Sequence, residues 1–315
     1  MAITDIAYVV FDHTDLDAAE RYYTDFGLTV AYRTSDEIGF RPAMERGYCY
    51  VACKAAKPGL RAIAFNASER ADLEVAARFP EASPILAIER EGGGAKVMLK
   101  SPDGLPFEIV HGIKPYPKIE TRAALTFNTG HDKPRRGEFQ RAPKSQAPVL
   151  RLGHIALLTN NFQANFEWMQ SRLGLRPTDI MFGEDKNVHV GSFMHVGGAQ
   201  DWTDHHTLAL FPDPHPRVHH ISFELEDLDA QGMSNMWMTQ QGWKPVWGIG
   251  RHIYGSQIFD YWFDPDGNIT EHFTDGDMVR PGSDPSYCAL DDDSLFAWGP
   301  PMQPAHFVSL AARHE

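Results

Sequence analysis

One short phrase occurs twice in this chain of 315 residues, and it constrains the fold more than any other feature. Residues 101–109 read SPDGLPFEI and residues 264–272 read DPDGNITEH, so a Pro-Asp-Gly turn precedes a short extended run in both copies. Glu108 and Glu271 occupy the same place in the two copies. Repetition of this kind indicates that the chain contains two related halves.

A second pair of similar segments lies nearer the start of each half. Residues 20–28 (ERYYTDFGL) match residues 167–175 (EWMQSRLGL), and each pattern is typical of the end of an amphipathic helix. Gly27 and Gly174 are expected to follow these helices with positive φ. The copies lie 147 residues apart here and 163 residues apart at the turn, so insertions distinguish the two halves.

Each half contains the same order of elements twice: an apolar strand, a helix and several alternating strands. We therefore predict an α+β fold of four β-α-β-β-β modules, paired into two homologous domains. The expected domains are 1–112 and 150–275, joined by a linker over 113–149 and followed by a C-terminal extension over 276–315. The extension carries aromatic residues that are expected to dock on the body or to reach a neighbouring subunit. The expected strands and helices cover residues 3–11, 60–65, 68–78, 84–90, 95–100, 106–110, 152–159, 218–224, 245–249, 256–263 and 268–273, with a further helical stretch that follows a polar turn over 226–229 and ends at Gln241.

Composition excludes several classes of protein. Lys and Arg number 29 against 42 Asp and Glu, and the resulting charge of −13 gives no support for nucleic-acid or anionic-membrane binding. No apolar run approaches the roughly 18–20 residues of a membrane span, and the N-terminus lacks the pattern of a signal peptide. The three cysteines show no CxxC spacing, which favours a reducing, cytoplasmic setting.

Histidine is unusually frequent, and its distribution points to chemistry. Ten of the 15 histidines fall between residues 150 and 275. His154 and His220 lie in the matched phrases His-Ile-Ala-Leu and His-Ile-Ser-Phe, so both imidazoles are expected on equivalent strands and on one face. Glu271 lies on the last strand of the same half. Two imidazoles and one carboxylate form a set that holds Fe(II) and leaves coordination positions open. The C-terminal domain is therefore predicted to enclose a metal.

These motifs resemble those of a known family. The second half is similar to the catalytic domain of type I extradiol ring-cleavage dioxygenases, of the catechol 2,3-dioxygenase kind, in the vicinal oxygen chelate (glyoxalase-like) superfamily. The resemblance covers residues 3–275 in architecture and is strongest over 150–275. It rests on Leu-Gly-His154, the pair His219-His220, the pair Arg251-His252, and the phrase YWFDPDGNITE that ends at Glu271.

The resemblance implies an activity and a set of site residues. It implies cleavage of a catechol-type aromatic diol beside its two hydroxyl groups, with O₂, at a mononuclear Fe(II) site, in aromatic compound catabolism. Mn(II) is the alternative metal, and a homo-oligomer is expected. In this family the second histidine of the His-His pair is the ligand, which favours His220 over His219. His205 resembles the acid/base histidine, with His206 left open as the alternative. His252 and Tyr261 resemble residues that hydrogen-bond the substrate.

The first half departs from this pattern. Alignment of the repeats places Asp5 opposite His154 and Ala62 opposite His220, so the N-terminal domain is expected to bind no metal. This agrees with the metal-free first domain of the family.

The second half also offers candidate residues for an apolar pocket wall. They are Trp202, Phe193, Trp247 and Ile249.

Two other functions fit the same scaffold. One is a glyoxalase-like, metal-dependent isomerase or thiol transferase, a class that draws its ligands from two half-sites. The other is a non-catalytic protein that binds an aromatic ligand, a class that is built from one short two-module chain. Three candidate ligands in one half, together with a length of four modules, favour the dioxygenase.

Overall fold

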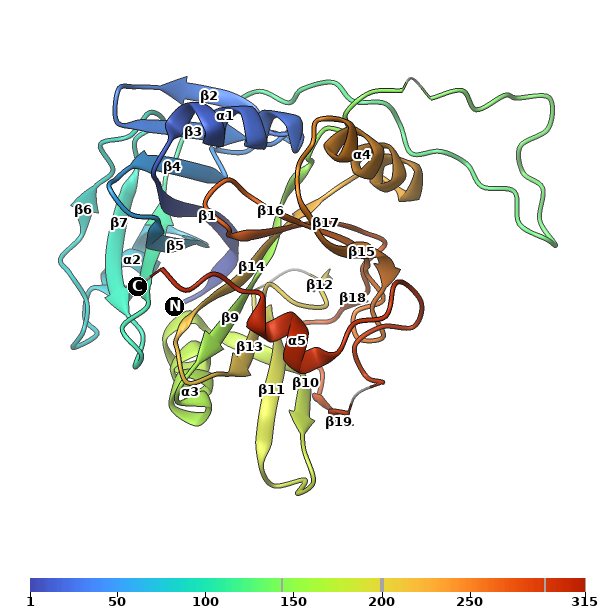
Figure 1. The fold of residues 1–315 in the computed structure, drawn as a ribbon. Helices are drawn as coiled ribbons and strands as arrows, with labels where there is room; N and C mark the ends of the chain where they lie inside the picture. The colour runs from blue at the N-terminus through green and yellow to red at the C-terminus, as the bar shows by residue number, and fades with distance from the viewer. Residues whose placement is uncertain (143, 199–200, 292, 315) are drawn as a thin grey trace.

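The computed structural model describes residues 1–142, 144–198, 201–291 and 293–314. Two large mixed sheets contain most of its strands, one from each half of the chain (Figure 1). The predicted α+β class is confirmed, and so are the four β-α-β-β-β modules.

The first sheet has eight strands in the order β2-β3-β4-β1-β5-β8-β7-β6. Its two modules meet at the centre, where β1 and β5 pair in antiparallel orientation. The helix of each module contacts the strands of its own module. The elements are β1 (Ile3–His13), α1 (Leu16–Asp25), β2 (Thr29–Arg33), β3 (Glu37–Arg41), β4 (Tyr50–Lys54), β5 (Gly59–Ala67), α2 (Arg70–Ala76), β6 (Leu86–Ala87), β7 (Ala95–Lys100) and β8 (Pro106–His111).

The second sheet repeats this arrangement and adds one strand. Its order is β15-β16-β17-β14-β9-β13-β11-β10-β19, so β9 corresponds to β1, β14 to β5, and β17 to β8. The added strand β19 comes from the predicted C-terminal extension and pairs with β10 at the sheet edge. The elements are β9 (Arg151–Thr159), α3 (Phe162–Leu173), β10 (Leu175–Phe182), β11 (His189–Val196), β12 (Thr203–Asp204), β13 (Leu208–Pro212), β14 (Arg217–Glu224), α4 (Leu228–Gln240), β15 (Pro245–Arg251), β16 (Ile258–Phe263), β17 (Ile269–Thr274), β18 (Met278–Val279), β19 (Ser286–Ala289) and α5 (Pro304–Ser309).

Polar side chains determine where the long helices begin. Asp15, Asn161 and Asp227 each precede a helix, and each side chain accepts a hydrogen bond from a backbone N–H of the first turn. Gly27 and Gly174 follow α1 and α3 with φ of 109° and 67°, as the sequence predicted. Among the described residues, no helix combines the length and the apolar character that a bilayer span requires.

One predicted strand is much shorter than expected. Of the strand expected over 84–90, only β6 forms. This segment lies at the edge of the sheet, and three glycines that follow it form the turn into β7. All three of these glycines, Gly92, Gly93 and Gly94, have positive φ. The prediction of 84–90 as a strand was therefore wrong in its extent.

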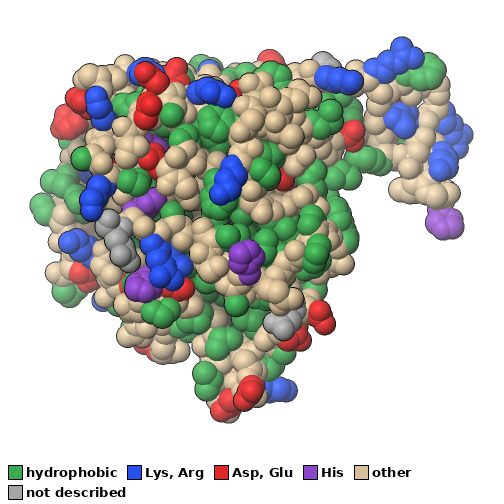
Figure 2. Space-filling model, in the orientation of Figure 1, with side chains coloured by type: hydrophobic (Ala, Val, Ile, Leu, Met, Phe, Trp, Pro, Cys, Tyr) green, Lys and Arg blue, Asp and Glu red, His purple; other side chains and the backbone are tan. Residues whose placement is uncertain are grey.

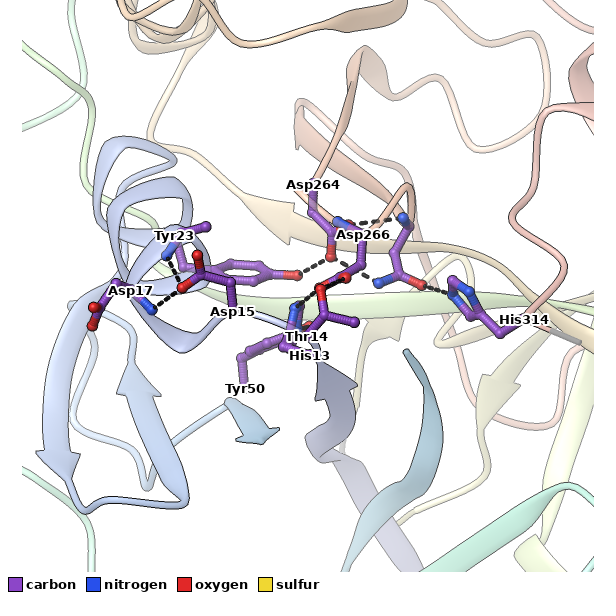
Figure 3. Close-up of polar contacts among 11 residues, drawn as sticks. His13, Thr14, Asp15, Asp17, Tyr23, Tyr50, Asp264, Asp266 and His314 are labelled. Atoms are coloured by element: carbon purple, nitrogen blue, oxygen red, sulfur yellow. Dashed lines mark hydrogen bonds and ion pairs between the residues drawn. The ribbon is translucent and has the colours of Figure 1, made fainter. Parts of the chain in front are cut away.

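The Pro-Asp-Gly turn that revealed the repeat also joins the two halves. In the second half, Asp266 of this turn reaches the end of β1 in the first half (Figure 3). Its carboxylate lies 2.7 Å from Nδ1 of His13 and accepts a hydrogen bond of 2.6 Å from the hydroxyl of Thr14. His13 also contacts the Tyr50 hydroxyl at 2.7 Å, and its side chain is fully buried.

The other copy of the turn makes the reciprocal contact. Asp103 reaches the end of β9 in the second half, where its carboxylate accepts a hydrogen bond of 2.5 Å from the Thr159 hydroxyl. It also accepts a hydrogen bond of 3.0 Å from the backbone N–H of Asn160. The two halves are thus connected by two equivalent carboxylates, which explains why the turn occurs in both copies.

The segment between the two sheets has no helix or strand over 113–142 and 144–149. Arg122 attaches it to the second half through two hydrogen bonds of 2.6 and 2.7 Å to the Asp227 carboxylate. Residues 126–142 then extend away from the body as an arm (Figure 1). Phe139 on this arm is 81% exposed, and Lys and Arg side chains gather on the same protrusion (Figure 2).

Candidate metal centre

A row of side chains crosses four adjacent strands of the second sheet. Ser222 of β14 is the register partner of both His154 on β9 and Glu271 on β17. Glu271 is in turn the partner of Tyr261 on β16. Register partners in a sheet point to the same face, so these four side chains share one face. His220 lies two residues before Ser222 and therefore points to that face as well.

The two imidazoles and the carboxylate of this face converge. Nε2 of His154 lies 3.1 Å from Oε2 of Glu271, and Nε2 of His220 lies 3.4 Å from the same oxygen. All three side chains are buried, and Glu271 has no exposed surface. The structure thus brings together the three residues that the sequence predicted as ligands, in a group that could hold a metal ion.

The Glu271 carboxylate provides a test of whether a cation fits here. Within the described chain neither of its buried oxygens accepts a hydrogen bond. A buried carboxylate without donors is costly, by several kcal/mol, and a divalent cation removes this cost. The separations of 3.1 and 3.4 Å also match the roughly 3 Å between neighbouring ligands of an ion that binds each of them at about 2.1 Å. The residues fit a divalent metal.

The protonation of these groups suits metal binding. Burial, followed by the neighbouring imidazoles, lowers the pKa of His220 well below its ordinary value, so this ring is neutral. Burial would raise the pKa of Glu271, but the imidazoles of His154 and His252 hold it below its ordinary value. A neutral imidazole and an ionised carboxylate are the forms that ligate metals.

A chain of hydrogen bonds orients the imidazole of His220. Nε2 of His219 lies 3.0 Å from the backbone carbonyl of Phe307 in α5, so this nitrogen carries the proton. Burial lowers the pKa of His219 to about 4, so its Nδ1 has a free lone pair. That lone pair accepts the proton of Nδ1 of His220, 2.7 Å away. The lone pair of His220 is therefore left on Nε2, which faces Glu271.

We predict that His219→Phe weakens metal binding by roughly 10- to 100-fold, because the mutant lacks the acceptor that fixes the His220 ring. His219→Asn, which retains an amide acceptor, is expected to restore part of the affinity. The measurement is a competition titration of Fe(II) or Mn(II) against a chelator of known affinity. Equal affinities of His219→Phe and the wild type would show that His219 does not orient the ligand.

The structure separates the two histidines of the pair His205-His206. The His206 side chain lines the cavity above the candidate ligands, and its ring centroid lies 4.3 Å from that of His154. His205 points away from the cavity, with Nε2 2.9 Å from the Asp179 carboxylate. Its Nδ1 lies 3.1 Å from Nδ1 of His206. The resemblance favoured His205 for the acid/base role, but its position favours the alternative, His206, with His205 behind it.

His252 and Tyr261 form a hydrogen-bonded pair at the cavity wall. Nδ1 of His252 lies 2.8 Å from the carbonyl of Leu295, so this nitrogen carries the proton of the neutral ring. Burial lowers the pKa of His252, which keeps the ring neutral. Its Nε2 therefore accepts a hydrogen bond of 2.8 Å from the Tyr261 hydroxyl. Both side chains line the same cavity as the predicted ligands.

The cavity has a volume of about 120 Å³ and extends from the candidate ligands to the C-terminal extension. Phe193 lines it, as the sequence predicted, and Trp247 lies behind the wall with its ring stacked on Tyr261 at 5.8 Å. Trp202 is half exposed and belongs to a different depression, so its prediction as a wall residue was wrong. Ile249 does not line the cavity either. The extension instead supplies wall residues that the sequence did not identify: Leu290, Ser294, Leu295, Pro304, Phe307 and Val308.

The equivalent row of the first sheet has no comparable pair of imidazoles. Ala64 of β5 is the register partner of both Tyr8 on β1 and Glu108 on β8. Tyr8, not Asp5 as the repeat alignment predicted, is therefore the counterpart of His154. Glu108 is satisfied within the protein, since the Tyr8 hydroxyl donates to it at 2.5 Å and Nζ of Lys96 lies 2.5 Å from it. In this half an ammonium group balances the buried carboxylate.

This contact predicts a stability effect. Lys96→Met leaves the Glu108 carboxylate buried without its cation, and we expect the free energy of unfolding to fall by roughly 2–3 kcal/mol. Lys96→Met combined with Glu108→Gln removes both charges and is expected to recover more than half of that loss. Urea denaturation of the metal-free proteins measures both values. A double mutant as unstable as Lys96→Met would refute the charge argument.

Comparisons with known proteins agree with this geometry. Residues 151–271 match the model of the Glyoxalase/Bleomycin resistance protein/Dioxygenase superfamily. Metapyrocatechase 2 of Cupriavidus necator is 29% identical over 310 residues, which cover 98% of this chain and 92% of that protein.

Two solved structures share the whole fold. Homoprotocatechuate 2,3-dioxygenase from Brevibacterium fuscum, in complex with 3,4-dihydroxyphenylacetate, superposes with a TM-score of 0.81 at 21% identity and covers 97% of this chain and 92% of its own. The Mn(II)-bound glyoxalase from Novosphingobium aromaticivorans gives a TM-score of 0.78 at 21% identity, with 97% of both chains covered. At this level of identity, the two structures establish a common fold.

Proposed function

We propose that the chain is an extradiol-type dioxygenase of the vicinal oxygen chelate superfamily, and that it cleaves a catechol-type diol with O₂ at one mononuclear Fe(II). His154, His220 and Glu271 are the proposed ligands, and Mn(II) is the alternative metal. Iron is favoured by the chemistry of the ligand set, because two imidazoles and one carboxylate are typical of non-haem Fe(II) oxygenases.

One observation carries this proposal. One ligand atom each of His154, His220 and Glu271 lies within 4.8 Å of the other two, on one face of the sheet, and that face borders a largely apolar cavity. These three residues would hold the metal, and the adjacent cavity would admit the substrate. A metal held in this way supplies a Lewis acid with open coordination positions, next to a space that a single aromatic ring can enter.

The residues of the chain would hold and move protons around the bound ring. His252 and Tyr261 form one pair, in which the tyrosine hydroxyl already donates to Nε2 of the imidazole. A diol hydroxyl that enters there can give its proton to His252 and accept a hydrogen bond from Tyr261. His206 is placed against His154 at the other side of the site, where a neutral imidazole can supply or accept a proton. The apolar wall excludes water during these transfers.

The isomerase alternative has less support. That class draws ligands from two half-sites, and the second half-site of this chain would include Glu108. This carboxylate already has Lys96 and Tyr8 as partners, and Ala62 offers no ligand atom at the position that corresponds to His220. The candidate metal group lies entirely in the second sheet.

The proposal is tested by loading the protein anaerobically with Fe(II) or with Mn(II) and adding a panel of catechols and air-saturated buffer. We expect one metal per chain, oxygen uptake with at least one catechol, and a yellow ring-fission product. Stoichiometric metal without oxygen uptake on any diol would contradict the proposal. Addition of a hemithioacetal to the same samples distinguishes the isomerase alternative.

The proposal extends to assembly and location. We propose a homo-oligomer in which the basic arm over 126–142 contacts a second copy, since the whole chain carries a charge of −13 and Phe139 on the arm is 81% exposed. Light scattering with size-exclusion chromatography should give a multiple of 35.4 kDa for the wild type and a smaller species for Phe139→Asp. A monomeric wild type would refute the proposed homo-oligomer.

We also propose a cytoplasmic location, which the three free cysteines favour.

A further inference from the structure

Apart from the candidate ligands and the other histidines, the cavity wall is largely apolar. The side chains that form it come from β9, β10, β11, β13 and the C-terminal extension. They include Leu158, Met181, Phe193, Phe211, Leu290 and Phe307. None of the described residues that line this cavity is Lys or Arg. The polar residues on this side, Tyr254, Gln257 and Ser294, are uncharged.

Two arginines that lie close in sequence to cavity-lining histidines form their hydrogen bonds outside the cavity. Arg217 donates to the Asp213 carboxylate at 2.6 Å and to the carbonyl of His215 at 2.7 Å. Arg251 donates to the carbonyl of Ser256 at 2.5 Å and to the Asp275 carboxylate at 2.7 Å. Neither guanidinium lines the cavity.

The cavity is also small. Its volume of about 120 Å³ compares with the roughly 150 Å³ of a cavity that holds one benzene molecule. One aromatic ring fills such a space, so a substituent that points away from the diol reaches the largely apolar residues at its wall.

We propose that this enzyme selects catechols whose ring substituents are small and uncharged, such as alkyl groups or halogens, and discriminates against substituents that carry a carboxylate. This inference rests on the proposed function, because it places the diol oxygens at the candidate metal and the substituent against the apolar wall. A carboxylate moved from water to that wall loses its hydration and gains neither a cation nor a hydrogen-bond donor of comparable strength. An uncharged substituent gains from the burial of its apolar surface.

The test uses two ring compounds of equal size and different charge. 3,4-Dihydroxyphenylacetamide and 3,4-dihydroxyphenylacetate differ only in an amide group against a carboxylate, and 4-methylcatechol serves as the small apolar reference. Binding to the Fe(II)-loaded protein is measured anaerobically by calorimetry, and turnover is measured separately by oxygen uptake. We expect affinity and kcat/KM to be roughly 100-fold higher for 4-methylcatechol than for the carboxylate, with the amide at least tenfold better than the carboxylate.

A pair of variants tests the same wall from the protein side. Met181 on β10 is 1% exposed and lines the cavity. Met181→Lys introduces a cation with a side chain of similar length. We expect this variant to raise the affinity for 3,4-dihydroxyphenylacetate, relative to that for 4-methylcatechol, by at least tenfold. Met181→Gln, which is polar and uncharged, is the matched control and should not favour the acetate over the amide. Circular dichroism and metal stoichiometry establish that both variants are folded.

The outcomes separate this inference from the proposed function. Equal or better binding and turnover of the carboxylate by the wild type would overturn the inference while leaving the dioxygenase intact. Preferential binding of the uncharged rings without any oxygen uptake would support the inference and refute the proposed function. A folded Met181→Lys variant that binds 3,4-dihydroxyphenylacetate as weakly, relative to 4-methylcatechol, as the wild type does would show that charge at this wall does not set the selectivity.

Discussion

Glu271→Ala is expected to bind Fe(II) at least about 100-fold more weakly than the wild type and to lose roughly 10³-fold or more in turnover. The carboxylate is the only anionic member of the candidate metal group, and its removal leaves two neutral imidazoles. A metal supplies several kcal/mol of transition-state stabilisation, and about 4 kcal/mol corresponds to that loss in rate. Metal analysis after desalting, combined with oxygen uptake, measures both effects.

The repeat provides a matched control for this substitution. Glu108→Ala removes a buried carboxylate at the equivalent position of the first sheet, where Tyr8 and Lys96 are its partners. This variant is expected to keep one metal per chain and oxygen uptake, although its unfolding free energy falls. If Glu271→Ala retains stoichiometric metal, or Glu108→Ala loses it, the assignment of the metal to the second half is incorrect.

His206→Gln is expected to bind metal and diol but to turn over roughly 10²- to 10⁴-fold more slowly, because the side chain that would transfer a proton beside the ligands is lost. The imidazole lines the cavity and lies against His154 without being one of the three candidate ligands. Single-turnover kinetics of the Fe(II)-loaded protein separates this chemical step from diol binding, which is measured anaerobically.

His205→Gln is the neighbouring substitution for comparison. His205 lies outside the cavity, between the Asp179 carboxylate and the His206 ring, and we propose it as a positioning residue. Its replacement should lower turnover only about tenfold and should change the pH profile of turnover, since the partner of His206 changes. A larger loss in His205→Gln than in His206→Gln would return the acid/base role to His205.

The predicted ligands could be found from the sequence because a sheet has a simple geometry. His154 and His220 occupy matched phrases in two modules, and side chains in such positions share a face once the strands pair. Glu271 was identified by its place in a repeated turn phrase. The structure places all three around one point, with Ser222 as the register partner that links His154 to Glu271.

The prediction that Asp5 is the counterpart of His154 in the first half was wrong because the pairing of β1 with β5 is irregular. β1 and β5 pair with irregular register between Ile3 and Asp5, between Ile6 and Tyr8, and between Val10 and Phe11. Each irregularity shifts the pairing, so equal spacing in the two repeats does not preserve the register. Tyr8 therefore takes the position that was assigned to Asp5.

The remaining part of the site depends on contacts that no periodicity encodes. His205 and His206 are adjacent and lie outside long strands, so the backbone path between β12 and β13 decides which ring faces the cavity. The C-terminal extension closes the cavity with Phe307 and Leu295, more than 70 residues after His220. The doublets His205-His206 and His219-His220 were the available signal, since in each doublet Nδ1 of the first ring contacts Nδ1 of the second.

A single turnover of the Fe(II)-loaded protein with one catechol under ¹⁸O₂ tests the central claim most directly. The ring-opened product, analysed by mass spectrometry before exchange with water, is expected to contain two ¹⁸O atoms. Cleavage must lie beside the diol rather than between its hydroxyl groups. A product that carries one label or none, or a diol that is recovered intact from protein with one bound iron per chain, would contradict the account.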